Sequence, residues 1–113
     1  MDRFRKIVPL IRSNDPIISS LNVCSINLTD DMVDQLIDAL HQNKYITKII
    51  FSKNNISEKS AAKIFNLITL NPKLNYFSMS DNNISDTAIE HLSRILIELP
   101  RSRDAISIVL RDN

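Results

Sequence analysis

The sequence predicts an α/β fold: a right-handed solenoid (a horseshoe segment) of strand–turn–helix repeats, with a parallel sheet on the concave face and helices on the convex face. The main observation is a repeat, because the segment Asn54–Ser60 (NNISEKS) returns 28 residues later as Asn82–Ala88 (NNISDTA). A related segment, Ile26–Met32 (INLTDDM), lies at the same spacing before it. A period of about 20–50 residues is typical of stacked structural units. The other two observations are a change of apolar spacing within each copy and helix signals that recur at the same offsets.

Short strands are predicted where apolar residues occupy alternate positions. The pattern occurs in Leu21–Val23, Ile49–Phe51, Phe77–Met79 and Ile108–Leu110. Side chains two apart along a strand point to the same side, so each segment turns two apolar residues toward a core. The first three segments follow the period of 28, and the fourth is displaced by three inserted residues.

A hydroxyl residue followed by an acid predicts the start of each helix. The hydroxyl at the N-cap accepts a hydrogen bond from a free backbone N–H, and the acid favours the positive helix end. The three pairs are Thr29-Asp30, Ser57-Glu58 and Ser85-Asp86. The apolar positions that follow have helical spacing: Val33, Leu36, Ile37 and Leu40; Ala61, Ile64, Phe65 and Ile68; Ile89, Leu92, Ile95 and Leu96.

The helix ends also carry recurring signals. Asn43 and Asn71 are expected to leave their helices in the left-handed conformation, and Pro72 and Pro100 prevent continuation. One strand–turn–helix unit cannot bury its apolar faces alone, so we expect stacked copies to close a common core.

Asparagines recur after each strand. Asn54, Asn82 and Asn113 form a predicted structural ladder, in which each amide satisfies buried backbone groups of the turn and bonds to the next copy. Ile26 breaks this column in the first copy, where a terminal unit is expected to be atypical. The neighbouring Asn27, Asn55 and Asn83 are assigned to the turn itself.

These columns, read as LxxLxLxxNxL, resemble the leucine-rich repeat family, specifically the ribonuclease-inhibitor type with 28-residue units. The resemblance covers residues 17–113 and departs from the family pattern at Met32, Ser60 and Ala88, where a small residue, often glycine, is usual. It implies a curved parallel sheet whose concave face or edges bind another macromolecule. The short array also looks similar to leucine-rich repeat effectors that bacteria deliver into host cells.

The predicted organisation is an N-terminal capping helix at 1–16 and repeats at 17–44, 45–72, 73–103 and, in part, 104–113. Phe4, Ile7, Val8 and Ile11 form an apolar stripe in the first segment. The stripe favours a cap over the first repeat, and a helix lying on a membrane surface is the alternative.

Composition excludes several classes of function. The formal net charge of +1 argues against a nucleic-acid-binding domain, and no apolar run is long enough for a membrane span. The absence of glycine excludes the common phosphate-binding glycine loops. A single cysteine, Cys24, indicates a reducing compartment, so we expect a cytoplasmic location, or delivery into a host cytosol for an effector.

The solvent side of the strands is the candidate site for a protein partner. Tyr76, flanked by Lys48 and Ile50, is the expected centre, since tyrosine is common at interface hot spots. A plain solvated sheet face is the alternative. We define the strand face by its candidate contact residues: Lys48, Ile50, Ser52, Tyr76, Ser78, Ser80, Val109 and Arg111.

No pattern predicts catalysis, a metal or a cofactor. Cys24 has no activating neighbour in the pattern, and His41 and His91 lack a second ligand. Asp30, Asp34 and Asp38 share one helix face, which is typical of a solvated surface. The run 81–83 lacks the glycine and terminal glutamate of a calcium loop.

The sequence therefore predicts a non-enzymatic protein-interaction scaffold. Two alternatives stay open: a regulator of a small GTPase, which one branch of this repeat type provides, and a structural segment of a longer array. The strand near Ile108 has no later strand to pair with in the sequence, so self-association through this edge is also expected.

Overall fold

The computed structural model describes residues 2–100, 105–111 and 113. Within these residues, helices and strands alternate in eight elements. In order they are α1 (Asp2–Arg12), β1 (Ser20–Asn22), α2 (Asp30–His41), β2 (Lys48–Ile50), α3 (Glu58–Leu70), β3 (Tyr76–Ser78), α4 (Asp86–Glu98) and β4 (Ser107–Val109).

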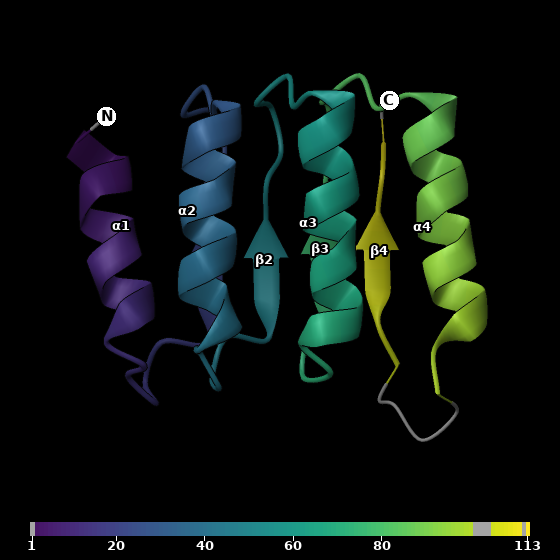
Figure 1. Cartoon of the computed structure of the whole chain (residues 1–113). Coiled ribbons are helices and arrows are strands. Elements are labelled where there is room, and N and C mark those ends of the chain that lie inside the picture. The colour runs from purple at the N-terminus through teal and green to yellow at the C-terminus, as the bar shows by residue number, and fades with distance from the viewer. Residues whose placement is uncertain (1, 101–104, 112) are drawn as a thin grey trace.

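The strands form one parallel sheet in the order β1-β2-β3-β4 (Figure 1). Ser20, Lys48, Tyr76 and Ser107 lie beside one another in register, at offsets of 28, 28 and 31 residues. The three-residue displacement of the last copy is therefore confirmed. The three additional residues precede β4. The repeat boundary predicted at 103/104 lies outside the described residues.

The helices form a second layer. Figure 1 shows α1 to α4 side by side over one face of the sheet, each in contact with the next. The molecule is thus a small α/β structure with a parallel sheet, as the sequence predicts at this level. The proposed division into a cap and repeats stays a prediction.

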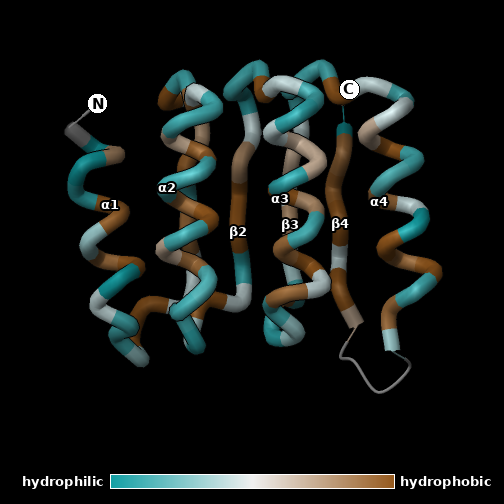
Figure 2. The backbone as a smooth tube through the Cα atoms, viewed as in Figure 1, coloured by the Kyte–Doolittle hydropathy of each residue, from teal (hydrophilic) through white to brown (hydrophobic). Residues whose placement is uncertain are grey.

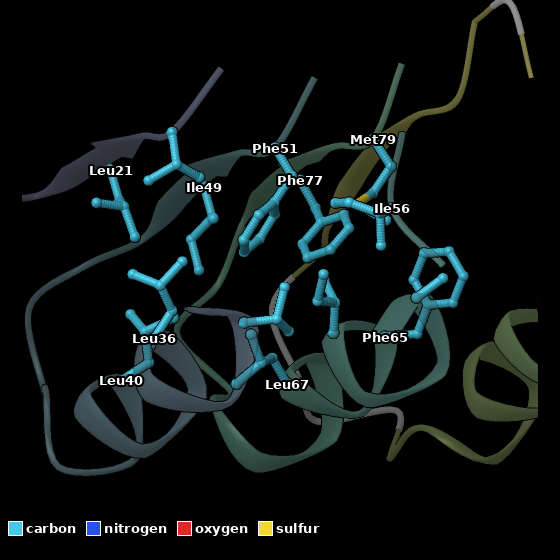
Figure 3. Close-up of a cluster of buried hydrophobic side chains, with 14 of the residues drawn as sticks. Leu21, Leu36, Leu40, Ile49, Phe51, Ile56, Phe65, Leu67, Phe77 and Met79 are labelled. Atoms are coloured by element: carbon cyan, nitrogen blue, oxygen red, sulfur yellow. The ribbon is translucent and has the colours of Figure 1, made fainter. Parts of the chain in front are cut away.

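The core lies between the two layers. Apolar residues alternate with polar ones along the helices, and β2 and β4 are mostly apolar (Figure 2). Phe51 and Phe77 point from the sheet toward the helices, and their ring centroids lie 5.7 Å apart (Figure 3). Phe65 reaches Phe77 from α3 with a centroid distance of 6.0 Å, and all three rings are fully buried.

The helix starts are confirmed. Thr29, Ser57 and Ser85 have extended backbones, and their side chains accept hydrogen bonds from the N–H groups three residues on. Two of the three following acids, Asp30 and Glu58, also bond to the cap of the next helix, which the sequence pattern did not predict. The hydroxyl of Ser57 donates to Asp30, and that of Ser85 donates to Glu58.

The predicted helix ends are wrong in their backbone conformation. Neither Asn43 nor Asn71 has a positive φ angle; the latter has φ −123°. The Asn43 side chain instead accepts from the N–H of Tyr45 (2.8 Å) and Ile46 (2.9 Å) and donates to the carbonyl of Ile11 (3.0 Å). An asparagine can satisfy the chain through its side chain without a left-handed backbone, and this is the solution found here.

Apart from Asn14 (φ 52°), which follows α1, the left-handed residues of the described chain lie between a strand and the next helix. They occur in pairs with the repeat spacing: Ser25 and Asn27, Lys53 and Asn55, Asp81 and Asn83. Asparagine tolerates this region better than most residues, which agrees with the turn role assigned to Asn27, Asn55 and Asn83. Because the chain contains no glycine, each of these left-handed positions holds a residue with a side chain, and its backbone is locally strained.

Most predicted core positions of the helices are buried, but α4 is an exception. Leu92 and Ile95 are buried, whereas Leu96 is 39% exposed. The equivalent residues in the earlier helices, Leu40 and Ile68, are buried because another helix follows them. None of the described helices has the length and apolar character of a membrane span.

Candidate binding face of the sheet

The strand face lies on the side of the sheet opposite the helices, and among the described elements no helix covers it (Figure 1). The parallel register brings its predicted residues into adjacent rows. Lys48 and Tyr76 are neighbours in one row, and Ile50, Ser78 and Val109 form the next.

The remaining residues of the strand face follow directly after the strands. Ser52 and Ser80 are held in place by backbone hydrogen bonds, since the N–H of Ser25 donates to the Ser52 carbonyl and the N–H of Lys53 to the Ser80 carbonyl. The carbonyl of Arg111 accepts in the same way from the N–H of Asp81, at 3.0 Å.

The middle of the strand face is an apolar patch around a buried polar residue. Ile50, Tyr76 and Val109 are half-buried, whereas Ser78 between them is only 5% exposed. The Ser78 hydroxyl lies 3.0 Å from that of Ser52, and the pairing explains how it can be buried. Large side chains therefore surround a small one on this face.

Charge differs between the strand face and the three helices α2, α3 and α4. The strand face carries exposed Lys48 and Arg111 and no acid. The helices α2, α3 and α4 carry only Lys59, Lys63 and Arg94 as permanent cations. Against these stand eight acids: Asp30, Asp31, Asp34, Asp38, Glu58, Asp86, Glu90 and Glu98.

The asparagines predicted as a ladder bond from turn to turn. Oδ1 of Asn54 accepts from the N–H of Ile26 (3.0 Å) and Leu28 (3.3 Å), and its Nδ2 donates to the carbonyls of Val23 and Phe51, both at 2.8 Å. Asn54 is 5% exposed.

The same arrangement repeats at the next two asparagines. Oδ1 of Asn82 accepts from the N–H of Asn54, and Oδ1 of Asn113 accepts from the N–H of Asn82 at 3.0 Å. Asn82 is buried and Asn113 is exposed. The ladder supports the turns, and its Nδ2 groups also donate to the backbone carbonyls of Ser52 (3.2 Å), Ser80 (3.1 Å) and Arg111 (3.2 Å) in the strand face.

The three aspartates on α2 each meet a different partner. Asp30 accepts hydrogen bonds from the hydroxyls of Ser60 (2.6 Å) and Ser57 (2.7 Å), and these bonds lower the pKa of its carboxyl below the ordinary value of 3.8. Asp34 pairs with Lys63 and Asp38 with Arg12, each at 2.8 Å on the surface. The structure therefore does not bring the three carboxylates together.

The remaining chemically reactive residues are dispersed. Cys24 is half-buried after β1, His41 lies at the exposed end of α2, and His91 bonds through Nε2 to Asn66 on α3 at 2.8 Å. These three side chains come from different elements, and in the described part of the chain they do not form a cluster.

One contact with a bearing on binding was not found by sequence reasoning. The guanidinium of Arg3 in α1 donates to the carbonyls of Asn22 (2.8 Å) and Cys24 (3.2 Å) at the free edge of β1. In the sequence, Arg3 belongs to the segment 1–16 that is predicted as a capping helix. Every residue has a backbone carbonyl, so a pattern of side chains cannot show which carbonyls accept a hydrogen bond. This contact could therefore be found only in the tertiary structure.

Comparisons with known proteins give a fold and no family. No family model and no curated protein matches this chain. A solved tropomodulin C-terminal domain from Caenorhabditis elegans matches with a TM-score of 0.72 and 20% identity, covering 83% of this chain and 57% of that one. A solved structure of leiomodin-1 actin-binding site 2 matches with a TM-score of 0.79 and 16% identity, covering 96% of this chain and 62% of that one.

These matches correct the family resemblance. The assignment to the ribonuclease-inhibitor type, and the likeness to bacterial effectors, are wrong: nothing in the comparisons supports them, and the matching structures are those of tropomodulin and leiomodin. The period and the asparagine column reflect what any such strand–turn–helix unit needs for its turn, so they do not distinguish one branch from another. Regulation of a GTPase likewise gains no support.

This chain spans less than two thirds of either matching structure. At such low identity the likeness concerns the fold alone: a small α/β structure compatible with a leucine-rich-repeat-like fold, of the kind seen in the tropomodulin C-terminal domain.

Proposed function

We propose that this chain is a non-enzymatic protein-binding module that uses the strand face. In this proposal the sheet is the concave side of a short right-handed solenoid, and the cap and repeats divide as the sequence predicts. The observation that carries the proposal is the uncovered apolar patch of Ile50, Tyr76 and Val109 around the buried Ser78.

The patch has the chemistry of an interface centre. Tyrosine provides a large contact area and a hydroxyl that can bond at the rim, and interface energy concentrates in a few such residues. The half-buried state of Tyr76 limits its side-chain entropy before binding, which lowers the cost of association.

Charge suggests what kind of surface the partner offers. Lys48 and Arg111 are both exposed beside the patch, and no acid of the strand face neutralises them. A partner surface with carboxylates around an apolar side chain would be complementary, and its association rate would fall with ionic strength.

Actin is the first partner to test, because the matching leiomodin-1 structure is that of an actin-binding site. The experiment is co-sedimentation with filamentous actin. Tyr76→Ala is expected to weaken binding by about 2 kcal/mol, or roughly 30-fold in Kd. Tyr45→Ala is the matched control, since Tyr45 is 38% exposed and lies outside the strand face.

The outcomes separate the two parts of the proposal. Equal binding by the wild type and the Tyr76→Ala variant would remove the strand face as the site. No binding by the wild type would remove actin as the partner. A cytoplasmic location and self-association through the β4 edge stay secondary proposals, the latter testable by sedimentation velocity across a concentration series.

A further inference from the structure

The free edge of β1 is closed by an arginine that takes the place of a strand. Inside the sheet, each strand accepts two hydrogen bonds from the strand before it, at carbonyls two residues apart. On β2 the carbonyl of Ile50 accepts from the N–H of Val23 at 2.9 Å, and that of Ser52 accepts from Ser25 at 3.1 Å. The same pair recurs between β2 and β3 and between β3 and β4.

On β1 the equivalent carbonyls, 28 residues earlier, belong to Asn22 and Cys24. No strand precedes β1 in the described sheet, and both carbonyls accept from the guanidinium of Arg3. An exposed strand edge is a ready template for another strand. Arg3 therefore occupies the two acceptors that an added strand would need.

A cavity lies beside this edge. Its volume is about 180 Å³, and α1 and β1 form its walls. The apolar lining includes Ile7, Leu10, Ile11, Ile18 and Leu21, and Arg3 lies at its border. Leu10 is 51% exposed, so the apolar lining opens to solvent.

We propose that this cavity and the β1 edge form a strand-addition site for an extended, apolar peptide segment that carries a carboxylate, and that Arg3 holds the site closed. The segment runs parallel to β1, donates backbone N–H groups to Asn22 and Cys24, and places an apolar side chain in the cavity. Main-chain hydrogen bonds supply affinity and the cavity supplies selectivity.

The carboxylate follows from what the segment must displace. Exposed Arg3 loses its two backbone acceptors when the segment binds, and a carboxylate is the strongest new acceptor for a guanidinium. No acid lines the cavity, so in this proposal the segment provides that carboxylate. Exposed Arg5 and Lys6 on the same helix favour the same charge.

A second copy of the chain fits this edge less well than a peptide. Its β4 has the required backbone groups, but its α4 would have to come with it. In this molecule α1 already packs against α2, where the helix of a preceding unit would lie. A bare extended segment meets no such obstacle.

The probe is a fluorescent synthetic peptide with the sequence of residues 73–84, titrated with the full chain and read by anisotropy. In the protein, the N–H of Met79 donates to Val109 and that of Asp81 donates to Arg111, so this segment carries donors at the required spacing. Phe77 or Met79 can enter the cavity, and Asp81 can meet Arg3. We expect saturable binding.

A peptide with N-methyl-methionine at position 79 is the decisive control. It keeps every side chain and loses one donor that faces β1, so we expect binding to weaken at least tenfold. A peptide added to the outer edge of β4 instead would use its other side and would be unaffected. Equal binding of the two peptides, or no saturation up to about 1 mM, overturns the proposal.

Protein variants locate the site. Leu10→Glu should weaken binding at least tenfold, whereas Leu70→Glu, at an equally exposed position (52%) on α3, should not. Arg3→Ala should bind the Asp81→Asn peptide severalfold more tightly than the wild type does, because the competing donor is gone. If Leu10→Glu impairs folding, as judged by circular dichroism, the comparison of the unmodified and N-methylated peptides still tests the proposal. Tyr76→Ala should leave this binding unchanged, so the two proposals fail independently.

Discussion

Asn82 supports the turn that contains Asn54. Its Oδ1 accepts hydrogen bonds from the N–H groups of Asn54 (2.9 Å) and Ile56 (3.2 Å), and its Nδ2 donates to the carbonyls of Phe51 (3.0 Å) and Met79 (3.1 Å). Asn82 itself is 1% exposed, so water has little access to replace any of these bonds. Its Nδ2 also donates to the Ser80 carbonyl (3.1 Å), so one amide bonds to five backbone groups across two strand ends.

Replacing Asn82 by Leu should therefore be strongly destabilising. The N–H groups of Asn54 and Ile56 would lose their acceptor, whereas the carbonyls of Phe51 and Met79 would keep the amides of Asn54 and Asn113 as donors. A buried unsatisfied group costs about 1–3 kcal/mol, so we expect a loss of at least about 2 kcal/mol in the free energy of unfolding, measured by denaturant titration. Asn83→Leu is the matched control: Asn83 is exposed with φ 55°, and only the left-handed strain of about 1–2 kcal/mol applies. A loss at position 83 equal to that at 82 would contradict the ladder.

Removing a helix cap should have a smaller effect. In Ser57→Ala the N–H of Ser60 loses its acceptor (3.1 Å) and Asp30 loses a hydroxyl donor (2.7 Å). A lost N-cap costs about 0.5–2 kcal/mol, and we expect the same for Ser85→Ala, measured by thermal and denaturant unfolding. Ser93→Ala in the exposed middle of α4 serves as the control and should be neutral or slightly stabilising, because alanine is the better helix former. Silent substitutions at both caps would mean that the helix starts are misplaced.

Stability should depend on pH through Asp30. The hydroxyls of Ser60 and Ser57 lower the pKa of its carboxyl in the folded state below the ordinary value of 3.8. Since the folded pKa is the lower one, this contribution is present above about pH 3.8 and is lost as the pH falls through the folded pKa. Unfolding curves from pH 5 down to pH 2, a window that spans these pKa values, should show a shallower acid slope for Asp30→Asn than for the wild type.

One substitution should stabilise the protein. Lys53 has φ 61°, a region that costs a residue with a side chain about 1–2 kcal/mol. Glycine removes this strain, although it adds about 0.5–1 kcal/mol of entropy to the unfolded chain. Lys53→Gly should thus gain about 0.5 kcal/mol net in a denaturant titration. Lys59→Gly, inside the first turns of α3, should lose up to about 1 kcal/mol, and a loss at both positions would contradict the turn geometry.

Much of this fold could be predicted because the helix and strand signals of each repeat act between residues that are close in the sequence. The N-cap hydroxyl of Ser57 acts on an N–H three residues away, and the alternation of Ile49 and Phe51 follows from strand geometry. The neighbours of a strand residue also follow from the period, which is why Tyr76 falls beside Lys48 and beside Ser107 even after the three-residue insertion. The rows of the strand face were predictable for the same reason.

Other features depended on contacts between groups that the period does not relate. Asn43 was expected to turn the chain with its backbone, but its side chain could reach Ile11 in α1 and took that role. Ser78 is buried because Ile50, Tyr76 and Val109 surround it, which depends on the sizes of residues from three strands. The branch of repeat protein was likewise beyond the pattern, since a shared turn geometry produces the same columns in different branches.

The closure of the β1 edge shows most directly the difference between what the sequence determines and what only the tertiary structure decides. Helix, strand and turn signals lie in side chains a few residues apart, so the amino-acid order alone was enough to place these elements and their register. The partners of Arg3 are backbone carbonyls 19 and 21 residues away, and every residue has such a carbonyl. Which carbonyls remain unpaired is decided only when the strands have assembled, because each strand satisfies the one after it and leaves the first without a donor.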